Sequence, residues 1–141
     1  MTRVVPPGTV LRVIPVPVLA LLKIAAFLDM PHAREKDAQD IFSILERYEL
    51  GGGRRFGPAL YDAGVDYQRA GAFLLGQDLA ALCNGTELEL VARFVRAVQD
   101  DSTSEATVFA RAAARPVFHE QGADRCAIIA AFAAGLSQGR L

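Results

Sequence analysis

The sequence predicts a mainly α fold, a small helical bundle with one short N-terminal strand. Signals that start and stop helices recur along the chain, at Pro17, Asp66, Asn84-Gly85, Ser102 and Gly135. The chain has 141 residues, of which 52% are hydrophobic, and this length and composition suit one domain with its own core. We therefore expect at least five helices and at most two short strands.

The predicted strand covers Val10–Ile14. These residues are mostly β-branched, alternate around Arg12, and are flanked by Gly8 and Pro15. An isolated strand leaves an unpaired edge, which favours pairing with another chain. A homodimer through this N-terminal strand is therefore one expectation.

The first helix is expected from Pro17 to about Leu28, because proline suits a first turn and Pro31 follows closely. A second helix, about 33–48, ends before the glycines at 51–53. The later helices are expected at Pro58–Asp62, Tyr67–Cys83, Glu87–Gln99, Ser104–Arg115 and Ala123–Ala134. Asp66 is expected to cap the second of these, a Thr86-x-x-Glu89 capping box the third, and Ser102 with Glu105 the fourth. Gly135 is expected to stop the last one.

Two glycines fall inside the predicted helix at Tyr67–Cys83. Gly71 and Gly76 weaken a helix intrinsically, because glycine loses more backbone freedom on folding than other residues. We expect them to permit close packing against a neighbouring backbone. Asp78 of the same helix is expected to be solvated or paired with another helix.

One lysine and one aspartate occupy apolar surroundings in the first two helices. Lys23 is the only charged residue between Val13 and Leu28. On the next helix, Asp37 projects into an arc of apolar residues, and a carboxylate there needs a compensating partner. We expect its carboxylate to lie within ion-pair reach of Lys23 or Arg34.

These charges also carry a family resemblance. The segment LKIAAFLD, followed by an R-x-K-D-x-x-D pattern at Arg34, Lys36, Asp37 and Asp40, resembles the later motifs of abortive-infection (type IV toxin) nucleotidyltransferases. The segment Ala70–Leu82 is similar to the helical half of predicted bacterial nucleotidyltransferases of this superfamily. The resemblance covers most of Val10 to Leu136 and is strongest from Leu19 to Leu82.

The resemblance implies a site and a division of the chain. It implies that Lys23, together with Arg34 and Lys36, binds the phosphates of the nucleotide. It also implies that Asp37 and Asp40 are the catalytic residues. Residues 1–15 would be a residual strand of a nucleotidyltransferase core and residues 16–141 the helical domain. The complete family fold uses Mg²⁺ and a nucleoside triphosphate and transfers the nucleotide to an RNA or protein acceptor.

The metal-binding part of that family pattern is missing from this sequence. The family requires an early Gly-Ser turn and an Asp-x-Asp pair that holds two divalent metals. The closely spaced acids here, Glu87 with Glu89 and Asp100 with Asp101, follow no such turn and strand. The chain therefore resembles the C-terminal part of an enzyme, incomplete as a catalyst alone. It would need a catalytic half or an antitoxin chain as partner, and neither Mg²⁺ nor nucleotide should bind it tightly by itself.

A second interpretation from another class stays open. The chain could be a non-catalytic helical interaction module in which Lys23, Arg34 and Asp37 form only an ion-pair network in the core. Such networks are common in folded proteins.

Composition excludes some partners and compartments. The net charge of −1 and the pI near 6.1 argue against bulk binding to nucleic acid. The apolar stretch Val13–Leu28 contains two prolines and Lys23 and is too short to span a membrane, so no membrane association is expected. Cys83 and Cys126 are far apart with no metal-binding spacing, and buried reduced cysteines are expected. These observations favour a cytoplasmic protein.

Overall fold

The computed structural model describes residues 13–50, 52–113 and 125–139, and over these ranges it is helical without any β-strand. The α-helices are α1 (Val16–Asp29), α2 (Glu35–Arg47), α3 (Pro58–Ala63), α4 (Tyr67–Leu82), α5 (Gly85–Gln99), α6 (Ser104–Ala113) and α7 (Arg125–Gly139). Two 3₁₀ turns, Pro31–Ala33 and Gly53–Phe56, precede α2 and α3. The predicted helical class and the minimum of five helices are confirmed.

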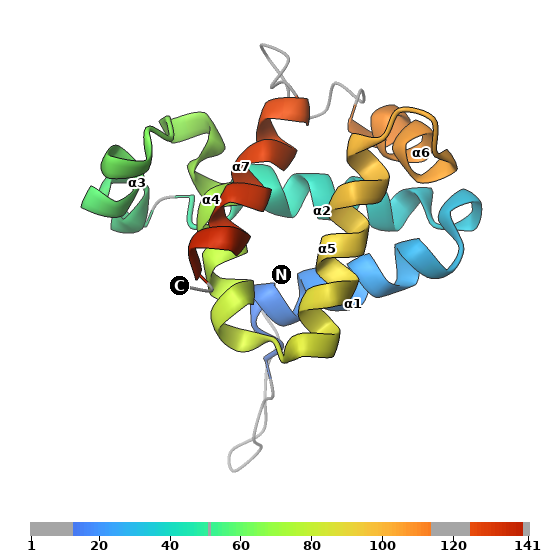
Figure 1. The fold of residues 1–141 in the computed structure, drawn as a ribbon, viewed down its shortest axis with the longest axis horizontal. Helices are drawn as coiled ribbons and strands as arrows, with labels where there is room; N and C mark the ends of the chain where they lie inside the picture. The colour runs from blue at the N-terminus through green and yellow to red at the C-terminus, as the bar shows by residue number, and fades with distance from the viewer. Residues whose placement is uncertain (1–12, 51, 114–124, 140–141) are drawn as a thin grey trace, which may run out of the picture.

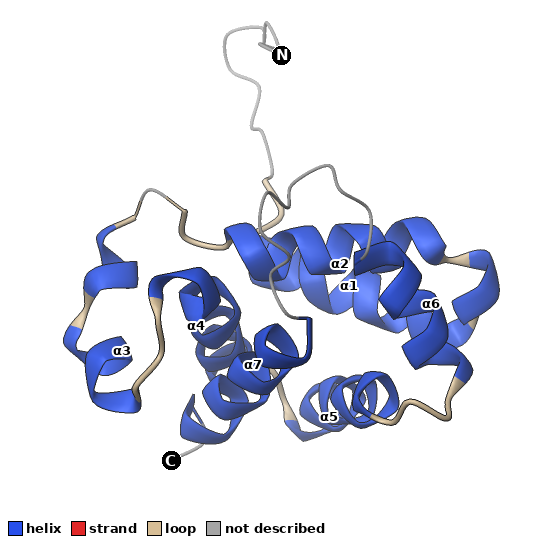
Figure 2. Cartoon of the chain, turned by 90° about the horizontal axis from the view of Figure 1, so that it is seen from above, coloured by secondary structure: helices blue, strands red, loops and turns tan. Residues whose placement is uncertain are grey.

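The helices form two groups that pack against each other. Helices α1 and α2 make a hairpin along one side of the molecule, and α4, α5 and α7 lie on the other side (Figure 2). Helix α6 contacts both α2 and α5 at one end, while α3 lies at the opposite end (Figure 1). The α1–α2 hairpin thus has one side against the bundle and one edge toward solvent.

Phenylalanines hold the helices of the two groups together. Phe27, Phe73, Phe94, Phe109 and Phe132 are fully buried. Phe94 of α5 packs edge-to-face on Phe27 of α1 and on Phe109 of α6, with ring centroids 6.0 and 5.7 Å apart. Edge-to-face pairs add to the stabilisation that comes from burial alone, so this chain of rings fixes α1, α5 and α6 relative to one another.

Helices α4 and α7 approach so closely that side chains are excluded from the contact. A Cβ atom on Gly76 would collide with the carbonyl oxygen of Phe132, and one on Gly135 would collide with the carbonyl oxygen of Phe73. The predicted role of Gly76 in close packing is confirmed. The predicted helix stop at Gly135 is wrong: α7 continues through it to Gly139, because glycine here serves the contact and not a turn.

Helix caps agree with the sequence in part. Asp66 caps α4, since its carboxylate accepts from the backbone N–H of Arg69. The capping box of α5 is formed by Asn84 and Glu87, two residues before the predicted pair. Asn84 accepts from the Glu87 N–H while Glu87 accepts from the Asn84 N–H, which satisfies both donors and makes a cap by Thr86 unnecessary.

The start of α6 also differs from the prediction. Thr103, not Ser102, accepts from the backbone N–H of Ala106, because α6 begins at Ser104 and Thr103 is the residue directly before it. Helix α2 begins at Glu35 and not at Ala33, which belongs to a 3₁₀ turn. The described helix α6 ends at Ala113, and the predicted extension to Arg115 lies outside the described residues.

The predicted N-terminal strand lies mostly outside the described residues. Val13 and Ile14 are described, and they are not in a strand. Cys126 is exposed and Cys83 only half-buried, so the expectation of two buried cysteines is wrong. None of the helices in the described ranges has the length and apolar character needed to cross a bilayer.

The glycine contact makes a prediction about stability. We expect Gly76→Ala and Gly135→Ala each to lower the free energy of unfolding by about 1–3 kcal/mol, because the new methyl group must push two backbones apart. Urea unfolding followed by circular dichroism measures this. Gly85→Ala is the control, since a Cβ there meets nothing within 4 Å and should leave stability unchanged or slightly raised. Equal effects at all three positions would contradict the role of the contact.

Candidate functional site

The charged residues of the sequence motif come together on the α1–α2 hairpin. The Lys23 ammonium lies 2.8 Å from an oxygen of Asp40 and 3.4 Å from an oxygen of Asp37. Arg34 lies 3.8 Å from the other oxygen of Asp37, and Lys36 lies 3.6 Å from Asp40. We call these five residues the Lys23 cluster.

Helix geometry explains why the cluster forms. The hairpin runs antiparallel, so the second half of α1 lies beside the first half of α2. Asp37 and Asp40 are one turn apart on α2 and point to the same side, where Lys23 reaches both. The prediction that Asp37 lies within ion-pair reach of Lys23 or Arg34 is therefore confirmed, and both pairs form.

Burial divides the cluster into an inner and an outer part. The side chains of Asp37, Lys23 and Asp40 are only 17%, 25% and 31% exposed, whereas Arg34 and Lys36 are 51% and 85% exposed. Contact with Asp40 raises the pKa of the Lys23 ammonium, although partial burial acts in the opposite direction. The inner three residues form a charge-assisted network, and the outer two are cations at its rim.

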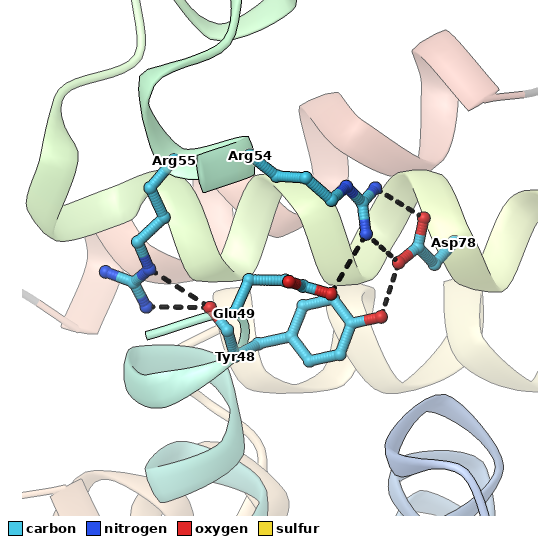
Figure 3. Close-up of polar contacts among 5 residues, drawn as sticks. All are labelled: Tyr48, Glu49, Arg54, Arg55 and Asp78. Atoms are coloured by element: carbon cyan, nitrogen blue, oxygen red, sulfur yellow. Dashed lines mark hydrogen bonds and ion pairs between the residues drawn. The ribbon is translucent and has the colours of Figure 1, made fainter. Parts of the chain in front are cut away.

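A second polar cluster, which the sequence did not predict as a site, joins the end of α2 to α4 (Figure 3). Arg54 donates two hydrogen bonds of 2.8 Å to the two oxygens of Asp78, and the Tyr48 hydroxyl donates to the same carboxylate. Arg54 also donates to Glu49. We call these four residues the Asp78 cluster. Asp78 is paired, but its partners lie just after α2 and in the 3₁₀ turn and not within another helix as predicted.

The cluster perturbs the proton affinities of its members. Desolvation and the hydrogen bond to Asp78 raise the pKa of the Tyr48 hydroxyl, so it stays protonated and donates. Burial acts to raise the pKa of Asp78, but the hydrogen bonds from Arg54 and Tyr48 outweigh it and lower that pKa. Asp78 is therefore held as a carboxylate and fixes the tyrosine side chain in place.

Arg55 turns the other way and binds the backbone (Figure 3). Its guanidinium donates to the carbonyl oxygens of Glu46, Tyr48 and Tyr67, and it lies over the Tyr67 ring at 5.1 Å. Burial lowers its pKa. Carbonyls at the end of a helix lack partners within the helix, so Arg55 closes the C-terminal end of α2.

Gly71 permits this arrangement at the end of α2. A Cβ at that position would lie 2.5 Å from a guanidinium nitrogen of Arg55 and 2.9 Å from the carbonyl oxygens of Leu45 and Tyr48. Its predicted role in close backbone packing is confirmed. Glu49, just beyond α2, adopts a left-handed conformation with φ of 59°, which is unfavourable for a residue with a side chain.

A cavity of about 460 Å³ opens beside the Asp78 cluster, where the start of α1 meets the end of α2. It is lined by Val16, Ser43, Ile44, Arg47, Tyr48 and Glu49. No local sequence pattern indicates this cavity, because its lining joins residues that are up to 33 positions apart. We call it the Tyr48 cavity.

The Lys23 cluster does not fit a site for two magnesium ions. Both of its carboxylates already contact the Lys23 ammonium, a cation that would compete with Mg²⁺ for the same oxygens. Within the described ranges, no group of three or more His, Cys, Asp and Glu side chains is placed to hold a metal ion. The cluster is better suited to contacting an anion at its cationic rim.

Comparison of the chain with protein-family models, with curated proteins and with solved structures finds no match.

The Asp78 cluster makes a prediction about pH. The lowered pKa of Asp78 means that its contribution to stability is complete above the ordinary carboxyl pKa of about 4 and is lost as pH falls through the lowered value. At pH 7 we expect Asp78→Asn to cost about 1–2 kcal/mol, the size expected for a partly exposed charge-assisted pair. Urea unfolding should show the difference from wild type shrinking toward pH 3.

Glu89→Gln is the matched control for that experiment. Glu89 forms an ion pair with Arg96 in which both side chains are more than 60% exposed, so its loss should change stability by less than about 0.5 kcal/mol. An Asp78→Asn cost that is independent of pH would contradict the assignment of the charge to Asp78.

Proposed function

We propose that this chain is the helical part of a nucleotidyltransferase-family protein and supplies a phosphate-binding lysine to a catalytic half on another segment or chain. The observation that carries the proposal is the Lys23 cluster. The sequence motif selects five charged residues on the basis of family resemblance, and these residues lie within ion-pair distance of one another across two helices.

The charge of the cluster supports an anionic ligand. Three cations and two carboxylates leave a formal charge of 3 − 2 = +1. Lys23 is 25% exposed, so its ammonium can contact a ligand while it remains anchored to Asp40. A lysine ammonium is a compact point charge on a flexible stem, and it can share its three donors between a carboxylate and a phosphate.

Each residue has a role in this proposal. Lys23 neutralises charge on the phosphates as an acceptor hydroxyl attacks the α-phosphorus and pyrophosphate leaves. Asp37 and Asp40 orient the lysine, and Arg34 and Lys36 draw the triphosphate toward it. Residues that hold metal ions belong to the other half, because the described residues do not fit them.

One observation favours the alternative, a non-catalytic helical interaction module. The Lys23 ammonium lies within 3.4 Å of two carboxylates of its own chain, and this arrangement satisfies it without any ligand. In that case the cluster only fastens α1 to α2. The two functions differ in whether anions bind at Lys23.

The deciding experiment is a titration with inorganic tripolyphosphate, followed by NMR chemical shifts of the ¹⁵N-labelled protein. We expect weak, millimolar binding that perturbs the amides around Lys23 and Asp40. Lys23→Met should weaken it about tenfold or more, because a charge-assisted contact is lost. Arg96→Met is the control, since it removes an equally charged and paired side chain from another helix. Equal binding by wild type and Lys23→Met would favour the interaction module.

A second experiment tests whether the chain is incomplete as a catalyst. We expect the purified chain to transfer no label from an α-labelled nucleoside triphosphate to RNA or protein in the presence of magnesium, because two metal ions cannot be replaced by one lysine. Labelling that Lys23→Ala and Asp37→Ala abolish would show that this chain holds a complete active site.

A further inference from the structure

The Tyr48 cavity and the Lys23 cluster lie along the same edge of the α1–α2 hairpin. On α1, Val16 and Lys23 are seven residues apart, so they project within about 20° of each other. On α2, Asp40 of the cluster and Ile44 and Arg47 of the cavity fall within an arc of about 60°. The cavity therefore begins one helical turn beyond the charged cluster.

The cavity has the size and lining of a small-ligand site. Its volume of about 460 Å³ lies within the range of about 300–1,000 Å³ that is usual for such sites. Its exposed lining is mostly apolar: Val16, Ile44 and Tyr48 are its hydrophobic lining residues, and Ser43, Arg47 and Glu49 are its polar ones. A mostly apolar wall that includes an aromatic side chain suits a flat aromatic group, which can stack on Tyr48.

The Tyr48 side chain is fixed before any ligand arrives. Its hydroxyl donates to Asp78, which Arg54 holds in turn through two hydrogen bonds (Figure 3). Glu49, the next residue in the cavity wall, is kept in its left-handed conformation with its carboxylate bonded to Arg54. A wall that is already ordered loses little conformational freedom on binding.

We propose that the Tyr48 cavity receives the nucleoside portion of a nucleotide whose phosphates extend toward Lys23. The inference rests on the proposed function and adds to it the place where the base and sugar bind. Asp40 and Tyr48 are eight residues apart, about 12 Å along the helix axis, a distance comparable to that between the base and the terminal phosphates of a nucleoside triphosphate. Bases of any kind stack on aromatic side chains, so Tyr48 provides affinity without selecting one base.

The test uses uncharged nucleosides, which separate this inference from the phosphate site. Adenosine and uridine are titrated into the ¹⁵N-labelled protein, and we expect the amide shifts to centre on Ser43, Ile44 and Tyr48. Tyr48→Leu keeps apolar volume but removes the ring, and it should weaken binding about fivefold or more. Tyr48→Phe keeps the ring and should bind within about threefold of wild type.

A second variant tests the cavity without changing Tyr48, so that the inference can still be tested if Tyr48→Leu impairs folding. Ser43→Met adds an uncharged side chain that fills the cavity from α2, and it should abolish the nucleoside shifts. Leu22→Met is its control, because Leu22 is 54% exposed on α1 and does not line the cavity. Both variants should retain the helical circular dichroism of the wild type.

The outcomes distinguish the two proposals. If adenosine triphosphate binds through Lys23 but adenosine perturbs no cavity residue, the inference is overturned and the proposed function stands. If adenosine binds in the cavity while Lys23→Met leaves triphosphate binding unchanged, the nucleoside site stands and the proposed function fails. Equal adenosine binding by wild type, Tyr48→Leu and Ser43→Met overturns the inference in either case.

Discussion

The ammonium of Lys23 has to be compensated, and the arrangement of the first two helices follows from that requirement. A partly buried cation on an otherwise apolar helix is costly without a partner, and so are Asp37 and Asp40 on the facing helix. Their pairing joins the edges of an antiparallel hairpin whose apolar residues, among them Ile24 and Ile41, are buried in the core. The same hairpin then places Val16 beside the end of α2 and forms the cavity wall. The ion-pair network and the cavity thus lie on one hairpin, and their relative positions follow from its geometry.

The two polar clusters differ in what they can do. In the Asp78 cluster each strong donor already has its acceptor, and the cluster joins a loop to a helix, so its role is to hold the Tyr48 wall in position. The Lys23 cluster has a surplus of cations, and two of them, Arg34 and Lys36, are more than half exposed. In the proposed arrangement, the Lys23 cluster attracts the ligand by its charge, and the Tyr48 cavity selects the ligand by its shape.

Local signals made parts of this structure predictable. The phase of Asp37 on its helix was enough to predict its partners, because i to i+3 neighbours and facing helices are constrained by helix geometry. The cap at Asp66 was predictable for the same reason. The Asp78 cluster was not, since Arg54 lies 24 residues away in a turn whose path depends on tertiary packing. The sequence around Gly135 predicts a helix stop, because only the position of α4 reveals that this glycine serves a contact between helices.

Helix α4 has an unusual position in this fold. Residues 70–76 are buried without interruption, so the middle of the helix has no solvent face, although its first turn is exposed. Gly71 adjoins the end of α2, and Gly76 adjoins α7. The backbone amides of residues 70–76 are therefore covered by several other elements, and no local opening of a single neighbour can expose them all. Hydrogen exchange in this segment should report only global unfolding, which makes α4 the natural internal reference for the stability of the whole molecule.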